Sequence, residues 1–389
     1  MKILVDRDQL WQGIDTVIDA VASKPALPIL SNILLTGEGD QLILSATDLD
    51  LSIRTAVPAV IRESGSITVP ARTFAGIARE WPASQLSIEV QDNRLLLSGK
   101  LGAIEGSEGV YSLAGISPDE FPEMPSTIEG LSVDFDAMEE AEAEALFVGG
   151  MLNKTSFAVS RDETRPVLNG VLWAIDAEGM TMVATDGYRF ARNRHLLDLK
   201  SQVGDKPGEV ILPPQASAYL VKVLGGQRRI HRLTLGASQI LFDLGSTQVL
   251  SRVIEGPYVN YEPVIPRQND KILRISKEML LPAVRRVSIL SSTHTHQVRM
   301  RISKNQVELS AASPEIGGEA REVIPANYSQ EELDVGYNAN YLIEILRKIE
   351  SDEVIFELHN AVTAALVRPG KQDQAEDYFC LLMPLRPST

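Results

Sequence analysis

The sequence predicts an α+β protein built from three similar units, and three observations lead to this prediction. An alternating apolar segment at residues 27–48 recurs without a gap 138 residues later, at 165–186, and more weakly at 298–313. A strand-like segment that leads into an amphipathic helix also occurs three times. At 389 residues the chain is too long for one ordinary core. We therefore expect three units of about 130 residues, each with two helices packed on antiparallel sheets.

Each unit is expected to begin with a helix. In the first unit Asp6 is a suitable N-cap, and Gln9 stands at the capping-box position. One apolar stripe follows, made of Leu10, Ile14, Val17, Ile18 and Val21. The equivalent helices are predicted at about 144–154, where two glycines weaken the pattern, and at about 276–290, where a proline interrupts it.

A β-hairpin is predicted after each of these helices. Apolar residues alternate on both sides of a polar turn, with the turns reading GEGDQ, DAEG and SKNQ in the three copies. The first two copies end in the same residues, Ala-Thr-Asp at 46–48 and at 184–186. We expect a strand-ending turn at Asp48 and at Asp186, and in the first copy the following LDLSI is expected to continue as a strand.

The second repeated pattern is a strand, a short connection and a helix. It occupies residues 67–82, 210–226 and 333–349, and each helix carries apolar residues at helical spacing.

Two segments rich in proline and acidic residues, 117–130 and 255–270, have the composition of linkers. We therefore assign the three units to residues 1–127, 128–262 and 263–389.

The formal charge is −15, from 37 basic and 52 acidic residues. This excess argues against a protein that grips nucleic acid over its whole surface, and it favours solubility. The single cysteine, Cys380, excludes an intrachain disulfide, so the cytoplasm is the expected compartment. No apolar run is long enough to span a bilayer, and the N-terminus lacks a signal pattern, so no membrane association is expected.

No catalytic or metal-binding constellation stands out, and we expect no catalytic residues, metal or cofactor. The chain lacks a P-loop, a nucleophile elbow and a glycine-rich dinucleotide turn. One alternative is a metal-dependent hydrolase that uses Asp186 with His195, or with His294 and His296. Another alternative is a scaffold that binds peptides only.

Seven segments occur in an order and at a spacing that together are specific: LPILSNILL, TDLDLSI, VPAR, DEFP, LNGVLW, ATDGYRFA and MPLR. With them the whole chain resembles the bacterial sliding clamp, the beta subunit of the replicative DNA polymerase. The resemblance implies three similar clamp domains that form half of a dimeric ring, with helices lining the hole. Duplex DNA would pass through the ring without sequence-specific contacts. The ring would tether polymerase subunits, the clamp loader and repair proteins, and it would catalyse nothing itself.

The resemblance also implies three sets of site residues. DNA would meet basic residues in or beside the predicted helices: Lys24, Arg72, Arg79, Lys222, Arg285, Arg286, Arg347 and Lys348. A groove for short partner peptides would be formed by Leu168, Thr185, Gly187, Tyr188, Arg189, Phe190, Val259, Val264, Leu381, Met383, Pro384, Leu385 and Arg386. The homodimer would pair strand edges through Lys100, Tyr111, Leu113, Ile289, Leu290, Glu315 and Glu319.

The chain departs from the family pattern at three places. An insertion at 101–110 carries Glu105 and Glu108 where basic residues often help to pair the dimer. The entry to the second unit, DFDAMEEAEAEA, is longer and acidic, and Pro-Ser-Thr follows Arg386 at the C-terminus.

Overall fold

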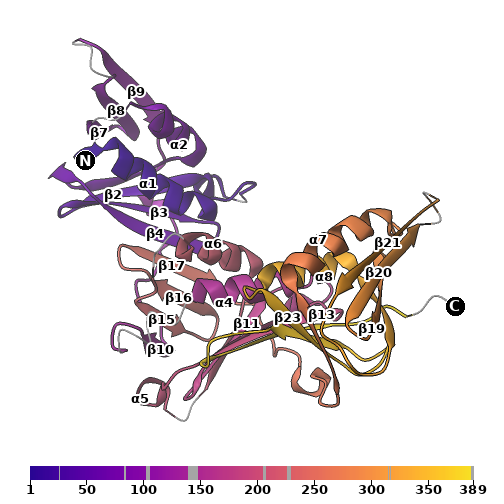
Figure 1. The fold of residues 1–389 in the computed structure, drawn as a ribbon. Helices are drawn as coiled ribbons and strands as arrows, with labels where there is room; N and C mark the ends of the chain where they lie inside the picture. Colours follow the sequence, from indigo (N-terminus) through magenta and orange to yellow (C-terminus); the bar gives the residue numbers. More distant parts are fainter. Residues whose placement is uncertain are drawn as a thin grey trace. The chain divides into compact units, whose positions relative to one another are not determined.

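The computed structural model describes residues 1–25, 27–82, 85–101, 106–138, 148–204, 207–225, 229–313, 315 and 317–386. These residues form two compact units, Met1–Glu140 with Gly226–Val253, and Ala141–Gly225 with Ile254–Thr389. In both units the sheets are antiparallel and the helices pack on them (Figure 1). This architecture confirms the predicted α+β class. The predicted insertion at 101–110, the acidic entry to the second unit and the C-terminal Pro-Ser-Thr lie partly or wholly outside the described residues.

The first unit contains two sheets, with strand orders β5-β1-β7-β8-β9 and β10-β15-β16-β17-β4-β3-β2-β6. Helices α1 (Arg7–Val17) and α2 (Ala71–Glu80) contact each other, and α1 packs on β3 and β4. The strands are β1 (Lys2–Asp6), β2 (Asn32–Glu38), β3 (Gln41–Thr47), β4 (Leu51–Pro58), β5 (Val60–Glu63), β6 (Gly65–Pro70), β7 (Gln85–Gln91), β8 (Arg94–Lys100), β9 (Glu108–Ala114), β10 (Leu131–Asp134), β15 (Arg232–Leu235), β16 (Gln239–Asp243) and β17 (Thr247–Arg252). Short 3-10 turns lie at η1 (Ile18–Ala20), η2 (Pro28–Ser31) and η3 (Pro118–Glu120).

The second unit also contains two sheets, with strand orders β14-β11-β12-β13-β25-β24-β23-β18 and β21-β20-β19-β22. Helices α4 (Val148–Thr155) and α6 (Pro214–Leu224) contact each other, as do α7 (Lys277–Val287) and α8 (Ala339–Lys348). The strands are β11 (Val171–Asp176), β12 (Gly179–Thr185), β13 (Arg189–Leu196), β14 (Gly208–Leu212), β18 (Lys271–Ser276), β19 (Gln297–Ser303), β20 (Gln306–Ser313), β21 (Gly318–Pro325), β22 (Leu333–Asn338), β23 (Glu353–Leu358), β24 (Ala365–Pro369) and β25 (Glu376–Leu382). The remaining short elements are α5 (Lys200–Val203), η4 (Ser156–Ala158), η5 (Pro166–Leu168), η6 (Glu262–Val264) and η7 (Ser288–Leu290).

The predicted helices are present, and the bounds of the first helix in the second and third repeats differ from those predicted. The Asp6 carboxylate accepts hydrogen bonds from the backbone N–H groups of Asp8 (2.9 Å) and Gln9 (3.3 Å), which confirms the predicted N-cap of α1. The helix predicted at about 144–154 is seen from Val148, because residues 139–147 lie outside the described part. The segment predicted at about 276–290 is α7 followed by the turn η7.

The repeated hairpins are β2–β3, β11–β12 and β19–β20, and the repeated strand-to-helix pattern is β6–α2, β14–α6 and β22–α8. The alternating apolar residues of the first hairpin, Ile33, Leu35, Leu42 and Leu44, are fully buried. The period-2 pattern therefore marked the core face of these strands correctly.

The first Ala-Thr-Asp copy forms the predicted turn, and the strand predicted for LDLSI starts two residues later than expected. One carboxylate oxygen of Asp48 accepts hydrogen bonds from the N–H groups of Asp50 (3.1 Å) and Leu51 (2.8 Å), and β4 begins only at Leu51. Leu49 has φ +82°, in the left-handed region that costs an L-residue roughly 1–2 kcal/mol. The carboxylate of Asp48 holds the backbone in this conformation without a glycine.

Two helix glycines of the first unit, Gly76 and Gly13, make a matched pair for a stability test. A Cβ at Gly76 would meet nothing within 4 Å among the described residues, whereas one at Gly13 would lie 2.8 Å from Leu44 Cδ1. Gly76→Ala should raise the free energy of unfolding by about 0.5–1 kcal/mol, because alanine has the higher helix propensity. Gly13→Ala should lower it by about 1–3 kcal/mol through overpacking. Urea unfolding of the two variants measures both effects, and shifts of the same sign would contradict this packing of α1.

Candidate functional site

The second Ala-Thr-Asp copy forms an ordered turn between β12 and β13. One carboxylate oxygen of Asp186 accepts hydrogen bonds from the N–H groups of Tyr188 and Arg189, each at 2.9 Å. The Thr185 hydroxyl donates to the carbonyl of Arg189 (2.7 Å) and accepts from the N–H of Gly187 (3.1 Å). Gly187 has φ +91°, so glycine stands at the position that Leu49 occupies in the first copy. The aspartate accepts the same two backbone N–H groups in both copies, but the Thr47 hydroxyl is hydrogen-bonded to the Ser52 hydroxyl (2.7 Å), whereas that of Thr185 donates to a carbonyl.

Strand β13 separates the following residues onto two faces of its sheet. Phe190 is 3% exposed and belongs to an apolar cluster on the face that it shares with Phe379 and Leu381 of β25. Its ring centroid lies 5.9 Å from that of Phe379 and 5.6 Å from that of Tyr261. The chain around Tyr258 and Tyr261 packs against this cluster, so the segment after β17 covers the face.

Four large apolar side chains remain exposed around this cluster: Tyr188 (61%), Val259 (40%), Val264 (59%) and Met383 (44%). We call these four residues the apolar patch. They flank residues in contact with the cluster: Val259 follows Tyr258, and Val264 precedes Ile265. Large exposed apolar side chains that flank a buried apolar cluster are typical of an interaction surface.

The C-terminal tail is fixed beside the patch by its main chain. The N–H of Met383 donates to the carbonyl of Tyr188 (2.9 Å), and the N–H of Leu385 donates to the carbonyl of Gly336 in β22 (2.8 Å). Pro384 and Leu385 are half-buried, and Arg386 is exposed. The tail therefore links the two sheets of the second unit.

Of the predicted groove residues, Phe190 and Leu381 lie in the apolar cluster, and Met383 is hydrogen-bonded to Tyr188 of the turn. Leu168 and Leu381 are buried, at 6% and 4% exposed, and Thr185 and Gly187 form the turn. Arg189 is placed differently. Its side chain is 9% exposed and points to the opposite face of the sheet, where it contacts η4 and α8.

Arg165 lies at the same turn, and the sequence reasoning did not include it. Its Nη2 is 3.5 Å from the carbonyl oxygen of Asp186, and its Nη1 would be 3.5 Å from a Cβ at Gly187. An ion pair with Asp162 (3.0 Å) holds it there. The repeat aligns Arg165 with Leu27, and this change from an apolar to a basic residue was the signal available in the sequence.

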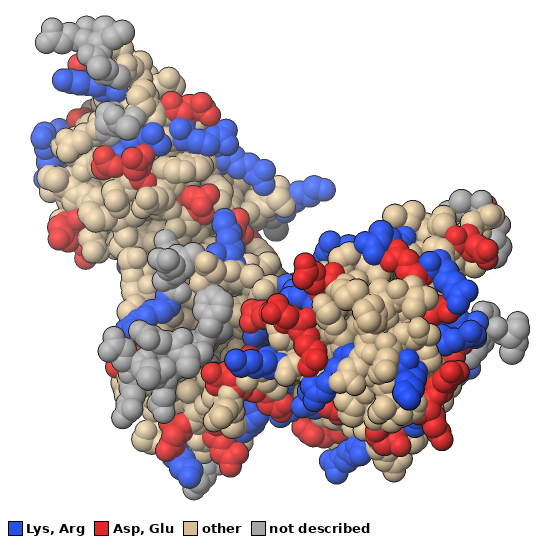
Figure 2. All heavy atoms as spheres, viewed as in Figure 1, with Lys and Arg blue, Asp and Glu red and all other residues tan. Residues whose placement is uncertain are grey.

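The predicted DNA-facing residues are mostly exposed. Seven of the eight are exposed and Lys348 is half-buried: the exposed ones are Lys24, Arg72, Arg79, Lys222, Arg285, Arg286 and Arg347. Acidic and basic side chains are interspersed on the face seen in Figure 2.

Arg79, Arg286 and Lys348 are among the basic groups that already have partners within the chain, and Arg79 Nε lies 3.3 Å from the Glu80 carboxylate. Arg286 makes a bidentate ion pair with Glu322 of β21, at 2.8 and 2.7 Å. The Lys348 ammonium donates to the side-chain oxygen of Asn153, and burial lowers its pKa.

The predicted dimer residues lie on or beside two sheet edges, β9 in the first unit and β21 in the second. Tyr111 of β9 is 44% exposed and packs its ring against Trp81, and Leu113 is half-buried. Ile289 is 73% exposed, and Leu290 lies against Gly318 of β21.

The charged members of this set have different surroundings. Lys100 pairs in register with Glu108 between β8 and β9. Glu319 is exposed on β21, whereas Glu315 accepts hydrogen bonds from the hydroxyl (2.9 Å) and N–H (3.3 Å) of Thr293.

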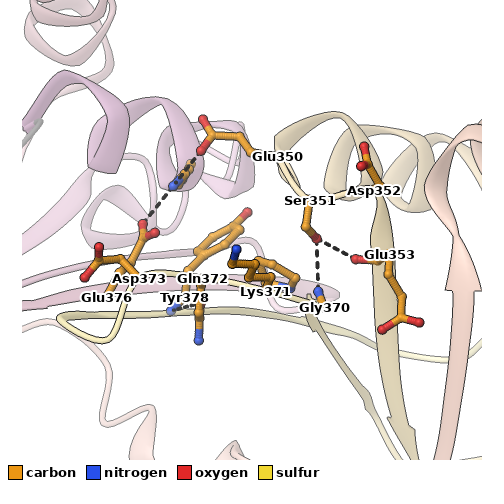
Figure 3. Close-up of a pocket in the computed structure, with 12 residues that line it drawn as sticks. Glu350, Ser351, Asp352, Glu353, Gly370, Lys371, Gln372, Asp373, Glu376 and Tyr378 are labelled. Carbon is orange, nitrogen blue, oxygen red and sulfur yellow. Dashed lines mark hydrogen bonds and ion pairs between the residues drawn. The ribbon is translucent and has the colours of Figure 1, made fainter.

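A pocket of about 700 Å³ lies where the end of α8 meets β25 (Figure 3). Its lining carries more acidic than basic groups: Glu350, Asp352, Glu353, Asp373 and Glu376 against Lys154 and Lys371. The Lys154 ammonium is 2.8 Å from Glu376 and 3.2 Å from Glu350, and it lies 5.7 Å from the centroid of the Tyr378 ring. This charge balance is unsuited to a phosphate group.

The residues of the alternative hydrolase do not form a reaction centre. Both carboxylate oxygens of Asp186 are used within its own turn, and His195 lies near the far end of β13, where burial lowers its pKa. Burial raises the pKa of the Cys380 thiol to about 12. Within the described part of the chain, no three His, Cys, Asp or Glu side chains lie close enough to hold a metal ion. None of the described helices has both the length and the apolarity that crossing a membrane requires.

Comparison with known proteins identifies the family. Three family models match successive parts of the chain: DNA polymerase III beta subunit N-terminal domain at residues 1–125, central domain at 147–260 and C-terminal domain at 262–386. The beta sliding clamp of Caulobacter vibrioides is 32% identical, over 99% of this chain and 100% of the relative.

Solved structures agree with this assignment. The DNA polymerase sliding clamp of Pseudomonas aeruginosa has 29% identity and a TM-score of 0.88, with both chains covered completely. A further structure of that clamp, described as bound to griselimycin, has 28% identity and the same TM-score and coverage. The resemblance found in the sequence is confirmed, and the chain belongs to the family of DNA polymerase III beta subunits, the beta sliding clamps.

Proposed function

We propose that two copies of this chain close into a ring around duplex DNA and tether polymerases and other replication and repair proteins to it, without catalysing a reaction. Each chain would consist of three domains, at residues 1–127, 128–262 and 263–389. The observation that carries it is the pairing of strands between successive domains, together with the edge strands β9 in the first unit and β21 in the second.

The two eight-stranded sheets are each built from two halves. In the first, β10, β15, β16 and β17 of the proposed central domain continue through the β17–β4 pair into four strands of the N-terminal domain. In the second, β14, β11, β12 and β13 continue through the β13–β25 pair into four strands of the C-terminal domain. Both joins are antiparallel.

The other two sheets are smaller: β9 is one edge of the first, opposite β5, and β21 is one edge of the second, opposite β22. Pairing β9 of one copy with β21 of the other would join them by the same device. Each copy offers one edge of each kind, so two head-to-tail contacts close the assembly. Closure would also protect the backbone groups of these edges from unwanted pairing.

A closed ring needs no strong affinity for DNA, because the protein dissociates only when the ring opens. Basic residues on the helices would then make mobile contacts with phosphates. Clamp-loader, polymerase and repair proteins would bind the apolar patch through short linear peptides. A surface with tyrosine and methionine side chains, and with Arg165 at its rim, suits such ligands.

Removal of two apolar side chains at the proposed closure contact should give monomers. Ile289→Ala with Leu290→Ala removes burial worth about 3 kcal/mol or more per contact, so the dissociation constant should rise at least 100-fold. Light scattering at micromolar concentration measures the mass of the assembly. Val362→Ala, a change at an exposed valine away from the predicted dimer residues, is the control.

The same variants test whether the ring encircles DNA. The unchanged chain and the control should stay on nicked circular DNA after loading and leave it when the circle is cut, whereas the double variant should not be retained. A dimer that persists in the double variant would contradict the interface. A dimeric wild-type chain that is not retained on the circle would contradict encirclement.

Neighbouring arginines on α7 allow the DNA contacts to be tested. Arg285→Ala should reduce the slope of log affinity against log salt by about 0.9 if this side chain neutralises one phosphate. Arg286→Ala should reduce it less, because Glu322 already neutralises that guanidinium. Titration of a short duplex at several salt concentrations measures both slopes. A larger loss for Arg286→Ala would show that the assignment on α7 is wrong.

Griselimycin, which is bound in the Pseudomonas aeruginosa structure, provides a probe for the apolar patch. Tyr188→Ala and Met383→Ala should each weaken its binding roughly tenfold or more, as expected for truncation of a large interface side chain. Val60→Ala, a change at an exposed valine of β5, should leave affinity unchanged. Calorimetric titration of the three variants gives the dissociation constants. Equal affinities throughout would place the ligand elsewhere.

A further inference from the structure

The turn at the apolar patch is attached to the tail on one side and to Arg189 on the other. Tyr188 is the most exposed member of the patch, and its carbonyl accepts the N–H of Met383 at 2.9 Å. Arg189 follows it directly, but its guanidinium lies on the opposite face of the sheet. Any shift of Arg189 therefore moves the backbone that presents Tyr188.

The Arg189 guanidinium is held by groups from three segments. Its Nε donates to Asp186 at 3.2 Å, its Nη2 donates to the carbonyl of Phe157 in η4 at 2.7 Å, and its Nη1 is paired with Glu344 of α8. The ring of Tyr341, also on α8, lies 4.5 Å from the guanidinium carbon. The ring of Phe157 lies 5.3 Å away. A planar guanidinium stacked and bonded in this way has little freedom.

Asp186 connects this cluster to the turn because its two carboxylate oxygens have separate tasks. One oxygen accepts the N–H groups of Tyr188 and Arg189, and the other accepts Nε of Arg189. If the guanidinium is displaced, the carboxylate loses the group that orients it, and the two amides lose a fixed acceptor. A series of contacts thus connects α8 to the patch. Tyr341 and Glu344 of α8 contact Arg189, Arg189 contacts Asp186, and Asp186 holds the backbone of Tyr188.

We propose that Arg189 is a positioning residue for peptide binding, and that α8 sets the affinity of the patch by holding its guanidinium. In this role Arg189 does not touch the ligand with its side chain. The proposal rests on the proposed function in one respect, namely that the apolar patch is the peptide-binding surface.

The first test needs no ligand. In Tyr341→Leu and Glu344→Gln, hydrogen exchange should become faster in the segment 185–190 of the dimeric full chain. Tyr341→Phe keeps the ring over the guanidinium and serves as the matched control, with exchange as in the unchanged chain. The equivalent turn at 47–52 is an internal control, because it belongs to the other compact unit and has Leu51 at the position of Arg189.

The second test measures griselimycin binding to the same variants. Tyr341→Leu and Glu344→Gln should weaken binding roughly tenfold, as expected when one interaction with a charged group is lost. Tyr341→Phe should bind as the unchanged chain does. Glu344→Gln changes a half-exposed side chain and is expected to fold normally even if Tyr341→Leu does not.

The outcomes separate the positioning role from the others. Faster exchange at 185–190 with weaker binding supports it. Weaker binding with unchanged exchange would mean that these side chains act on the ligand directly. Faster exchange at both turns would mean general loosening of the structure. Either result overturns the proposal, and so does the absence of a change in both measurements. If the unchanged chain does not bind griselimycin, the site assignment fails, and the exchange result alone decides whether α8 orders the turn.

Discussion

Antiparallel backbone pairing between distant parts of the chain is the interaction on which the rest of this structure depends. The β13–β25 pair joins Arg189 to Leu382 and His195 to Glu376 in one register. This pairing places Phe190 beside Leu381, brings the tail to Tyr188, and sets α8 against the other face. Without this pairing Tyr188 and Met383, which are far apart in the sequence, would not lie next to each other. Because buried N–H and carbonyl groups must be paired, the register leaves little freedom.

Local patterns in the sequence predicted the elements of this fold well. Alternation identified the repeated hairpins, helical spacing identified the second helix of each unit, and Asp6 was identified as a cap. The joins between sheets could not be obtained in the same way, since β4 and β17 carry no local mark of their long-range partner. The sequence assigned the central repeat to one unit. In the structure its strands are divided between the two compact units, with β10 and β15–β17 in the first and β11–β14 in the second.

The sequence did not predict the directions in which the proposed site residues point their side chains. Resemblance supplied Arg189 and Phe190 together, although consecutive strand residues face opposite sides of a sheet. The same limit applies to Arg286 and Lys348, whose partners Glu322 and Asn153 come from other elements. A helix pattern shows that a basic residue is outward-facing, but the acceptor that reaches it from elsewhere depends on tertiary packing.

The tail at the apolar patch is fixed by amides and carbonyls, at Met383 to Tyr188 and Leu385 to Gly336. Main-chain anchors keep their geometry when side chains are exchanged. Substitutions of the Tyr188 or Met383 side chain would therefore alter the chemistry of this surface and leave the path of its backbone in place.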